Sequence, residues 1–206
     1  MVDSTVQNPE QRRKIHPHKF AMWIGMGSIT MMFAGLTSAY MVREGQGNWR
    51  YYSLPGVFWV STAIIILSSI TMFLGVRAFK KRRMHEYRLL ISITLILGIL
   101  FAILQFIGFY LLAHQLQAVR INGQVLSEAT AIHVNGNPSE SFLYIIAGLH
   151  LVHVIGGVIA LLVVFYRAFN SRIKVYNVTG LEIVSAYWHF VDILWIYLFM
   201  FFLVNQ

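Results

Sequence analysis

The chain alternates between long apolar runs and short polar segments. Five runs contain almost no Lys, Arg, Asp or Glu, and they occupy residues 20–42, 54–76, 89–113, 142–166 and 183–204. Each run reaches the roughly 20 residues that a helix needs to cross about 30 Å of hydrocarbon. None shows the period-two alternation of a membrane β-barrel strand. The pattern predicts an all-α integral membrane protein with five transmembrane helices.

The five runs are expected to form one domain. Residues 20–206 make a single five-helix membrane domain, preceded by a polar segment at residues 1–19. Basic residues precede the first run as in a secretory signal peptide, but that run is far longer than the roughly 7–15 apolar residues of such a peptide. We therefore interpret the first run as a retained span. The polar stretch at 115–140 is expected to be the one large loop, on the outer surface.

Composition excludes several classes of protein. Only 12% of the residues are charged, against roughly 25% in soluble domains, and 57% are hydrophobic. A soluble enzyme domain of any size does not fit beside the five spans. The chain has no cysteine, which excludes disulfides, iron–sulfur clusters and zinc or copper sites with thiolate ligands.

The basic residues indicate an orientation. The chain has 16 Lys and Arg against 8 Asp and Glu, a net charge of +8. Counted by predicted loop, 13 of the 16 fall in the N-terminal segment and in the second and fourth loops, and 3 fall in the other loops. By the positive-inside rule, the N-terminus is expected in the cytoplasm and the C-terminus outside. The excess charge is thus a signal of topology and of contact with anionic lipid, and no nucleic-acid partner is expected.

Five polar side chains inside the predicted spans are candidates for a functional role. They are Gln105, His150, His153, His189 and Asp192. A charged group at the bilayer centre costs about 2.5–3.5 kcal/mol, so such residues are expected to have partners or a function. The two His of the fourth span, and the His and Asp of the fifth, are each spaced i,i+3 and share a helix face. We interpret the five residues as a structural polar cluster, with no catalytic residue and no metal ligand.

The depth of these residues follows from the helical rise of about 1.5 Å per residue. His153 and Asp192 both fall near mid-span, so they are predicted to face each other, with His189 nearer the cytoplasm. His150 is predicted nearer the outside, at the depth of Gln105. Contact between helices is favoured over a reaction centre for groups of this kind.

Two alternatives use the same residues. His150 or His153, together with His189, could ligate one haem in a small b-type membrane cytochrome. His153 and Asp192 could instead form the centre of a proton-coupled transporter, although no internal repeat supports that architecture.

Two strings in the chain resemble a known family. Residues 187–195 read Tyr-Trp-His-Phe-Val-Asp-Ile-Leu-Trp, and residues 148–157 read Gly-Leu-His-Leu-Val-His-Val-Ile-Gly-Gly. Both resemble signatures of subunit III of haem–copper (cytochrome c) oxidases, and the length resembles the short five-helix bacterial form. The signature residues, with a Glu at the entry to the last helix, are Tyr187, Trp188, His189, Phe190, Asp192, Trp195, Gly156, Gly157 and Glu182. The chain departs from the family at Ile29 and Gly108, where the family usually has carboxylates.

The resemblance implies a supporting subunit of a bacterial respiratory oxidase that passes electrons from cytochrome c to oxygen in the cytoplasmic (inner) membrane. It implies no cofactor in this chain: haem and copper belong to the expected partners, the catalytic subunit I and the copper-bearing subunit II. It also implies bound phospholipid and a role in sustaining proton uptake. A quinol oxidase is the alternative complex, and a larger respiratory supercomplex is a further possible partner. The two missing carboxylates leave open any proton-related role of positions 29 and 108.

Overall fold

The structure is a computed structural model that describes residues 17–46, 54–117, 120–121, 124–125, 138–170 and 178–205. Within these ranges it contains five α-helices: α1 (Pro17–Glu44), α2 (Val57–Lys80), α3 (Met84–Gln117), α4 (Pro138–Phe169) and α5 (Val178–Val204). All five are long and apolar enough to cross a membrane, which confirms the predicted spans.

Every helix is longer than the apolar run that predicted it. For example, α3 begins at Met84, although its apolar run begins at residue 89, and it takes in Glu86 and Arg88. Charged side chains near a helix end reach the polar edge of the membrane while the backbone stays helical. Apolar content therefore marks the middle of each span and not its ends.

Two short strands lie in the segment that was predicted to be an outer loop. β1 (Arg120–Ile121) and β2 (Gln124–Val125) pair antiparallel, with Arg120 opposite Val125 and Ile121 opposite Gln124. The pattern of the sequence did not predict this pair. It lies outside the five helices and leaves the membrane domain all-α in the part of the chain that the structure describes.

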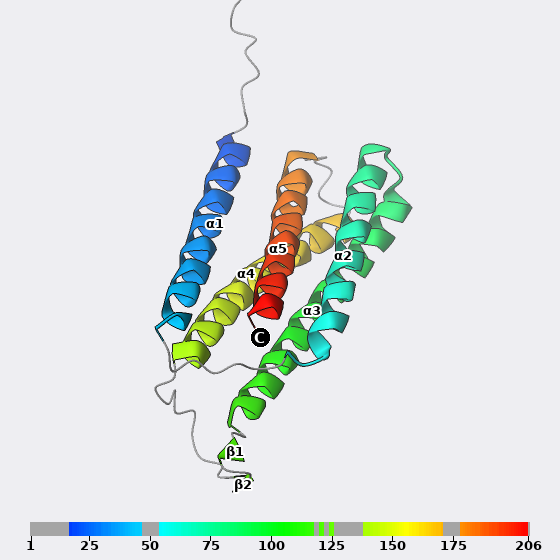
Figure 1. Ribbon diagram of the computed structural model, residues 1–206. Helices are drawn as coiled ribbons and strands as arrows, with labels where there is room; N and C mark the ends of the chain where they lie inside the picture. Colours follow the sequence, from blue (N-terminus) through cyan, green and yellow to red (C-terminus); the bar gives the residue numbers. More distant parts are fainter. Residues whose placement is uncertain are drawn as a thin grey trace, which may run out of the picture.

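Successive helices run in opposite directions (Figure 1). Both α1 and α5 begin at the end of the bundle where α2 gives way to α3. We call this end the basic end, because Lys19, Lys80, Arg88 and Arg167 lie there, whereas Arg43 lies at the other end of α1. The predicted orientation in the membrane rests on this asymmetry.

The last helix lies in the middle of the bundle (Figure 1). It packs against α1, α2 and α4, whereas α1 packs only against α4 and α5 among the described elements. Accordingly, the span of α5 is the most buried of the five. Side chains on α5 can therefore reach three other helices.

Aromatic rings fill the core. The largest fully buried side chains include Trp188 and Trp195 of α5, Phe33 and Tyr40 of α1, and Phe58 of α2. The outward faces carry many exposed Ile, Leu, Val and Phe side chains. Such a surface is stable where the surrounding solvent is lipid.

The turn between α2 and α3 is tight. The Arg82 N–H donates to the Phe79 carbonyl oxygen at 3.0 Å, and the Arg83 N–H donates to the Ala78 carbonyl oxygen at 3.0 Å. These two bonds define a Schellman motif, which usually holds glycine at the position that Arg82 takes with φ of 59°. The motif fixes the backbone between the last turn of α2 and the first turn of α3.

Candidate functional site

Three levels of polar contacts follow one another along the bundle, starting from the basic end. At the first level, Glu182 of α5 forms an ion pair with Lys19 of α1 at 2.6 Å and another with Lys80 of α2 at 2.7 Å. One carboxylate therefore ties three helices together. We call these three residues the Glu182 clamp. All of them are partly exposed, as expected at the edge of the membrane.

The second level is built around Trp188. Its indole Nε1 donates to Ser68 Oγ of α2 at 3.1 Å, and the Ser68 hydroxyl lies 3.4 Å from the Thr94 carbonyl oxygen of α3. The ring lies in a slot between α3 and α4 that has glycine on both sides. A Cβ at Gly98 would meet the Trp188 ring at 2.8 Å, and a Cβ at Gly157 would meet it at 3.0 Å.

His189 and Asp192 lie beside this slot and face α2. The His189 Nδ1 and the Ser69 hydroxyl are 2.6 Å apart and share a hydrogen bond. The carboxyl group of Asp192 lies next to Ser69 as well. Neither of its two oxygens meets a hydrogen-bond partner among the described residues. Ser69 therefore lies beside both His189 and Asp192.

The third level joins all four helices other than α1. The Trp195 indole donates to Thr62 Oγ1 at 3.0 Å, and the Gln105 amide of α3 donates to Ser61 Oγ at 3.2 Å. The imidazole of His150 on α4 stacks on Trp195, with ring centroids 5.2 Å apart. Because Ser61 and Thr62 are adjacent, His150 and Gln105 lie at the same level, as their predicted depths imply.

His153 does not form the predicted pair with Asp192. Its Nδ1 is 2.6 Å from the Leu149 carbonyl oxygen one turn earlier in α4, and its ring meets the Phe33 ring of α1 edge-on at 5.8 Å. Depth along the membrane was estimated from helical rise, but rise does not fix the rotation of a helix about its axis. Neither carboxyl oxygen of Asp192 has a hydrogen-bond partner among the described residues, so the prediction that His153 and Asp192 face each other as a pair is wrong.

The imidazoles do not converge on a common ligand position. His150 of α4 is covered by the rings of Trp195 and Phe101, whereas His189 is hydrogen-bonded to Ser69 of α2. Two axial ligands of one haem must face the same space. Among the described residues, no group of three His, Cys, Asp or Glu side chains could hold a metal ion. The geometry favours contacts between helices over a ligand site.

Comparison with known proteins agrees with this architecture. Residues 53–205 match the sequence model of the family described as cytochrome c oxidase subunit III. The chain belongs to this family. A probable cytochrome c oxidase subunit 3 of Nocardia farcinica is 34% identical over 85% of this chain and 82% of its own length. Cytochrome c oxidase subunit 3 of Corynebacterium diphtheriae is 31% identical over 82% and 79%, and that of Bacillus sp. strain PS3 is 25% identical over 86% and 80%.

Membership of the subunit III family confirms the resemblance on which the signature residues were chosen. Of these, Trp188, His189 and Trp195 all reach α2, through Ser68, Ser69 and Thr62.

Tyr187 instead points to α4, where its hydroxyl donates to the His153 carbonyl oxygen at 3.1 Å and lies 3.7 Å from the position of a Cβ at Gly156. Phe190 packs against the aromatic core.

The two positions that lack the family carboxylates are occupied differently. At Gly108 the Phe58 ring of α2 fills the space, because a Cβ there would stand 2.8 Å from Phe58 Cε1. A longer side chain at position 108 therefore requires the Phe58 ring to move. Ile29 is partly buried and packs against the aromatic core. Both positions contribute to apolar packing in this chain.

Sequence reasoning missed the partners of the signature residues. Ser61, Thr62 and Thr94 were not singled out. Ser68, Ser69 and Lys19 lie in stretches that resemble the family, and Lys80 was counted as a basic loop residue, but none of the four was assigned a partner on α5. Single Ser and Thr residues are common in membrane helices, so no one of them is a signal by itself. The two Ser-containing pairs at 61–62 and 68–69 are seven residues apart, which places them on one face of α2. That spacing was the available signal.

Proposed function

We propose that this chain is the non-redox supporting subunit III of a bacterial respiratory haem–copper oxidase that reduces oxygen with electrons from cytochrome c. The observation that carries the proposal is the use of the family's signature side chains. Trp188, His189 and Trp195 each form a hydrogen bond with a hydroxyl group of α2. Such an interior stabilises a rigid bundle.

The redox chemistry belongs, in this proposal, to partner subunits. Subunit I carries the catalytic haem and copper, subunit II carries further copper, and this chain packs against subunit I. Two features support that division. The chain has no cysteine, and the half-buried imidazoles of His189 and His153 are hydrogen-bonded to Ser69 and Leu149, whereas the buried imidazole of His150 stacks on Trp195. The chain then supports assembly and proton uptake through the catalytic subunit.

The proposal includes retained phospholipid. An apolar groove of about 360 Å³ lies between α3 and α4, with Ile103 and Phe106 on one side and Leu151 and Ile155 on the other. A groove of this character at the depth of the hydrocarbon suits a lipid acyl chain. The proposed setting is the bacterial cytoplasmic membrane, with the basic end in the cytoplasm.

The first test is purification of the tagged chain in a mild detergent, with mass spectrometry of the proteins that co-purify. Recovery of a haem-bearing catalytic subunit and a copper-bearing subunit is the expected result. A chain that purifies alone with a Soret band would support the small cytochrome instead. A chain that purifies alone and colourless would contradict both and return attention to the transporter.

The second test separates support from catalysis. Asp192→Asn and His153→Ala are each expected to lower the yield or thermal stability of the complex more than its oxygen consumption per haem. Gly25→Ala is the matched control, because no heavy atom lies within 4 Å of a Cβ at this exposed position. Normal yield of a complex that no longer reduces oxygen would contradict a supporting role.

A further inference from the structure

A second hollow lies at the basic end, and none of its lining residues belongs to the three levels of polar contacts. It measures about 330 Å³ and lies between the last turns of α2 and the first turns of α3. Its apolar lining residues are Leu74, Ala78 and Leu90, which we call its floor. Its rim carries three cationic side chains and one carboxylate. We call it the hairpin pocket.

The rim of the hairpin pocket has unbalanced positive charge. Arg83 forms an ion pair with Glu86 at 3.1 Å, which uses the only carboxylate among the lining residues. Arg77 and Lys81 are spaced i,i+4 and share a helix face, and both are exposed. Neither has an acidic partner among the described residues. Two cations are therefore available to an external anion.

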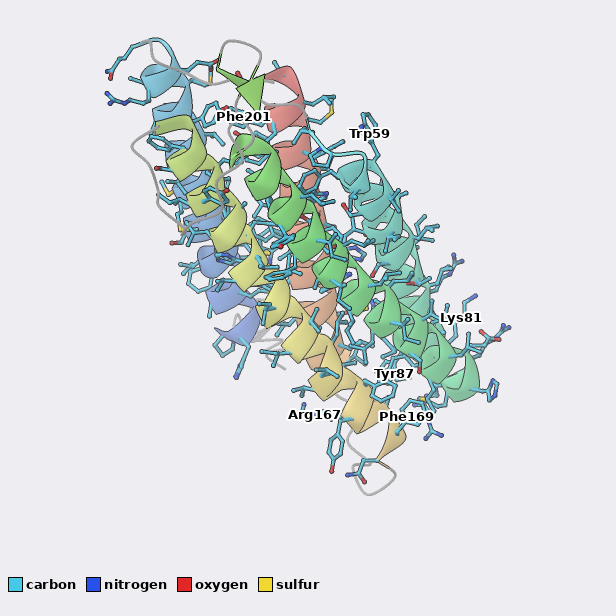
Figure 2. All side chains as sticks on the ribbon, turned by 90° about the horizontal axis from the view of Figure 1, so that it is seen from below. Trp59, Lys81, Tyr87, Arg167, Phe169 and Phe201 are labelled. Atoms are coloured by element: carbon cyan, nitrogen blue, oxygen red, sulfur yellow. The ribbon has the colours of Figure 1, made fainter. Side chains whose placement is uncertain are left out.

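The hairpin pocket lies where a span leaves the hydrocarbon. The apolar run of α2 ends at Val76, so Arg77 is its first charged residue, and Leu74 one turn earlier is 41% exposed on the outer face. Figure 2 shows Lys81 at the outer edge of this end, with its side chain directed away from the bundle. An amphiphile can therefore place an anionic head on the rim and a chain along Leu74 without moving any helix.

The backbone of the turn prepares this arrangement. The Schellman motif at Arg82 brings the Arg83 N–H to the Ala78 carbonyl oxygen, which closes the turn around the pocket. Lys81 and Arg83 are thereby held on either side of one fixed residue. A site of this kind binds an anion with less ordering of the chain than a flexible loop does.

We propose that the hairpin pocket binds the phosphate of an anionic phospholipid, with Arg77 and Lys81 as the binding cations. Juxtamembrane Lys and Arg attract anionic lipid, and each contributes to affinity near the surface. The apolar floor favours a lipid over a free phosphate ion, because a free ion makes no apolar contact with Leu74 and Leu90. The excess of two cations favours an anionic lipid over a zwitterionic one. This site is separate from the groove between α3 and α4.

The test measures binding of phosphatidylglycerol and phosphatidylcholine to the full-length chain in detergent, by native mass spectrometry with stepwise addition of each lipid. The double variant Arg77→Gln/Lys81→Gln is expected to bind phosphatidylglycerol about tenfold more weakly, with little change for phosphatidylcholine. Each single variant is expected to lose about threefold. The matched control is Arg43→Gln/Arg167→Gln, which removes the same charge elsewhere and is expected to change affinity less than twofold. Figure 2 shows Arg167 at the end of α4, apart from Lys81.

Three outcomes would overturn the proposal. Equal losses in the double variant and its control would show that only net charge matters. Displacement of bound phosphatidylglycerol by millimolar inorganic phosphate would assign the site to the free ion. Unchanged lipid affinity, together with loss of co-purifying proteins from the double variant, would assign the pocket to a protein contact. Because lipid binding is measured on the chain without its partners, a failure to bind lipid would leave the proposed role in an oxidase untouched.

Discussion

The indole ring of Trp188 lies so close to Gly98 that a Cβ at position 98 would stand 2.8 Å from Trp188 Cη2. The Trp188 ring has little free space to move away from position 98. On its other side a Cβ at Gly157 would stand 3.0 Å from it, and its nitrogen is hydrogen-bonded to Ser68. The close approach of α3, α4 and α5 thus depends on two glycines and one rigid aromatic side chain.

The first prediction tests this slot. Gly98→Ala is expected to lower the free energy of unfolding by about 1–3 kcal/mol, because an extra methyl group overpacks a rigid and fully buried neighbour. Thermal unfolding of the purified chain or complex in detergent measures the loss. Gly25→Ala is the control, since its Cβ meets nothing within 4 Å, and it is expected to be neutral or stabilising. Equal losses for the two variants would contradict a specific role for the slot.

The second prediction concerns the hydrogen bond from Trp188 to Ser68. Ser68→Ala leaves the buried indole N–H without its partner and is expected to cost about 0.5–2 kcal/mol. Trp188→Phe removes the donor, so Ser68→Ala should cost less in that background. A double-mutant cycle from unfolding in detergent measures the coupling. Strict additivity of the two substitutions would show that the bond contributes nothing.

The spans could be predicted from the sequence because hydrocarbon imposes a simple rule: about 20 apolar residues must come in a row. The same rule says nothing of where a helix ends in the polar region. For this reason α3 begins at Met84 and not at the start of its apolar run. The rule also does not apply to the strand pair that joins Arg120 and Val125, because these strands lie outside the five spans.

The candidate site was predictable in depth but not in rotation. Helical rise places His150 level with Gln105. Gln105 donates a hydrogen bond to Ser61, and His150 stacks on Trp195, which donates a hydrogen bond to the adjacent Thr62. The predicted contact of His153 with Asp192 failed because His153 instead approaches a carbonyl oxygen of its own helix. The rotation of a helix about its own axis is decided by packing. Here the fit of the Trp188 ring in its slot contributes to that rotation.

The third prediction compares two histidines. Both ring nitrogens of His150 are buried without a hydrogen-bond partner among the described residues, and its ring stacks on Trp195. His150→Phe keeps the stacking and removes unpaired polar atoms, so it is expected to leave stability unchanged or to raise it. His189→Phe breaks the bond to Ser69 and is expected to cost about 0.5–2 kcal/mol.

Unfolding of the two variants in detergent gives the comparison, and the yield of the assembled complex gives a second reading. If His150→Phe proves the more damaging change, the imidazole of His150 has a polar partner that packing alone does not supply. That partner would be a haem iron or a polar group on another subunit.

The fourth prediction concerns the Glu182 clamp. Glu182→Gln removes the charge that pairs with both Lys19 and Lys80. Since all three side chains are partly exposed, the expected loss is only about 0.5–1 kcal/mol at low ionic strength. The loss should shrink in 1 M salt, where the screening length falls to about 3 Å. Thermal unfolding at the two salt concentrations measures both values.

The clamp has a natural control in the second carboxylate of the basic end. Glu86 pairs with Arg83 three residues away in the same α2–α3 hairpin, so Glu86→Gln removes a local ion pair and leaves the contacts between helices intact. Its cost is expected to be no more than a few tenths of a kcal/mol. A larger and salt-sensitive loss in Glu182→Gln would assign the difference to charge that joins α1, α2 and α5. A loss that persists undiminished in 1 M salt would instead assign the effect of Glu182 to packing, and the ion pairs would then have no part in holding these three helices together.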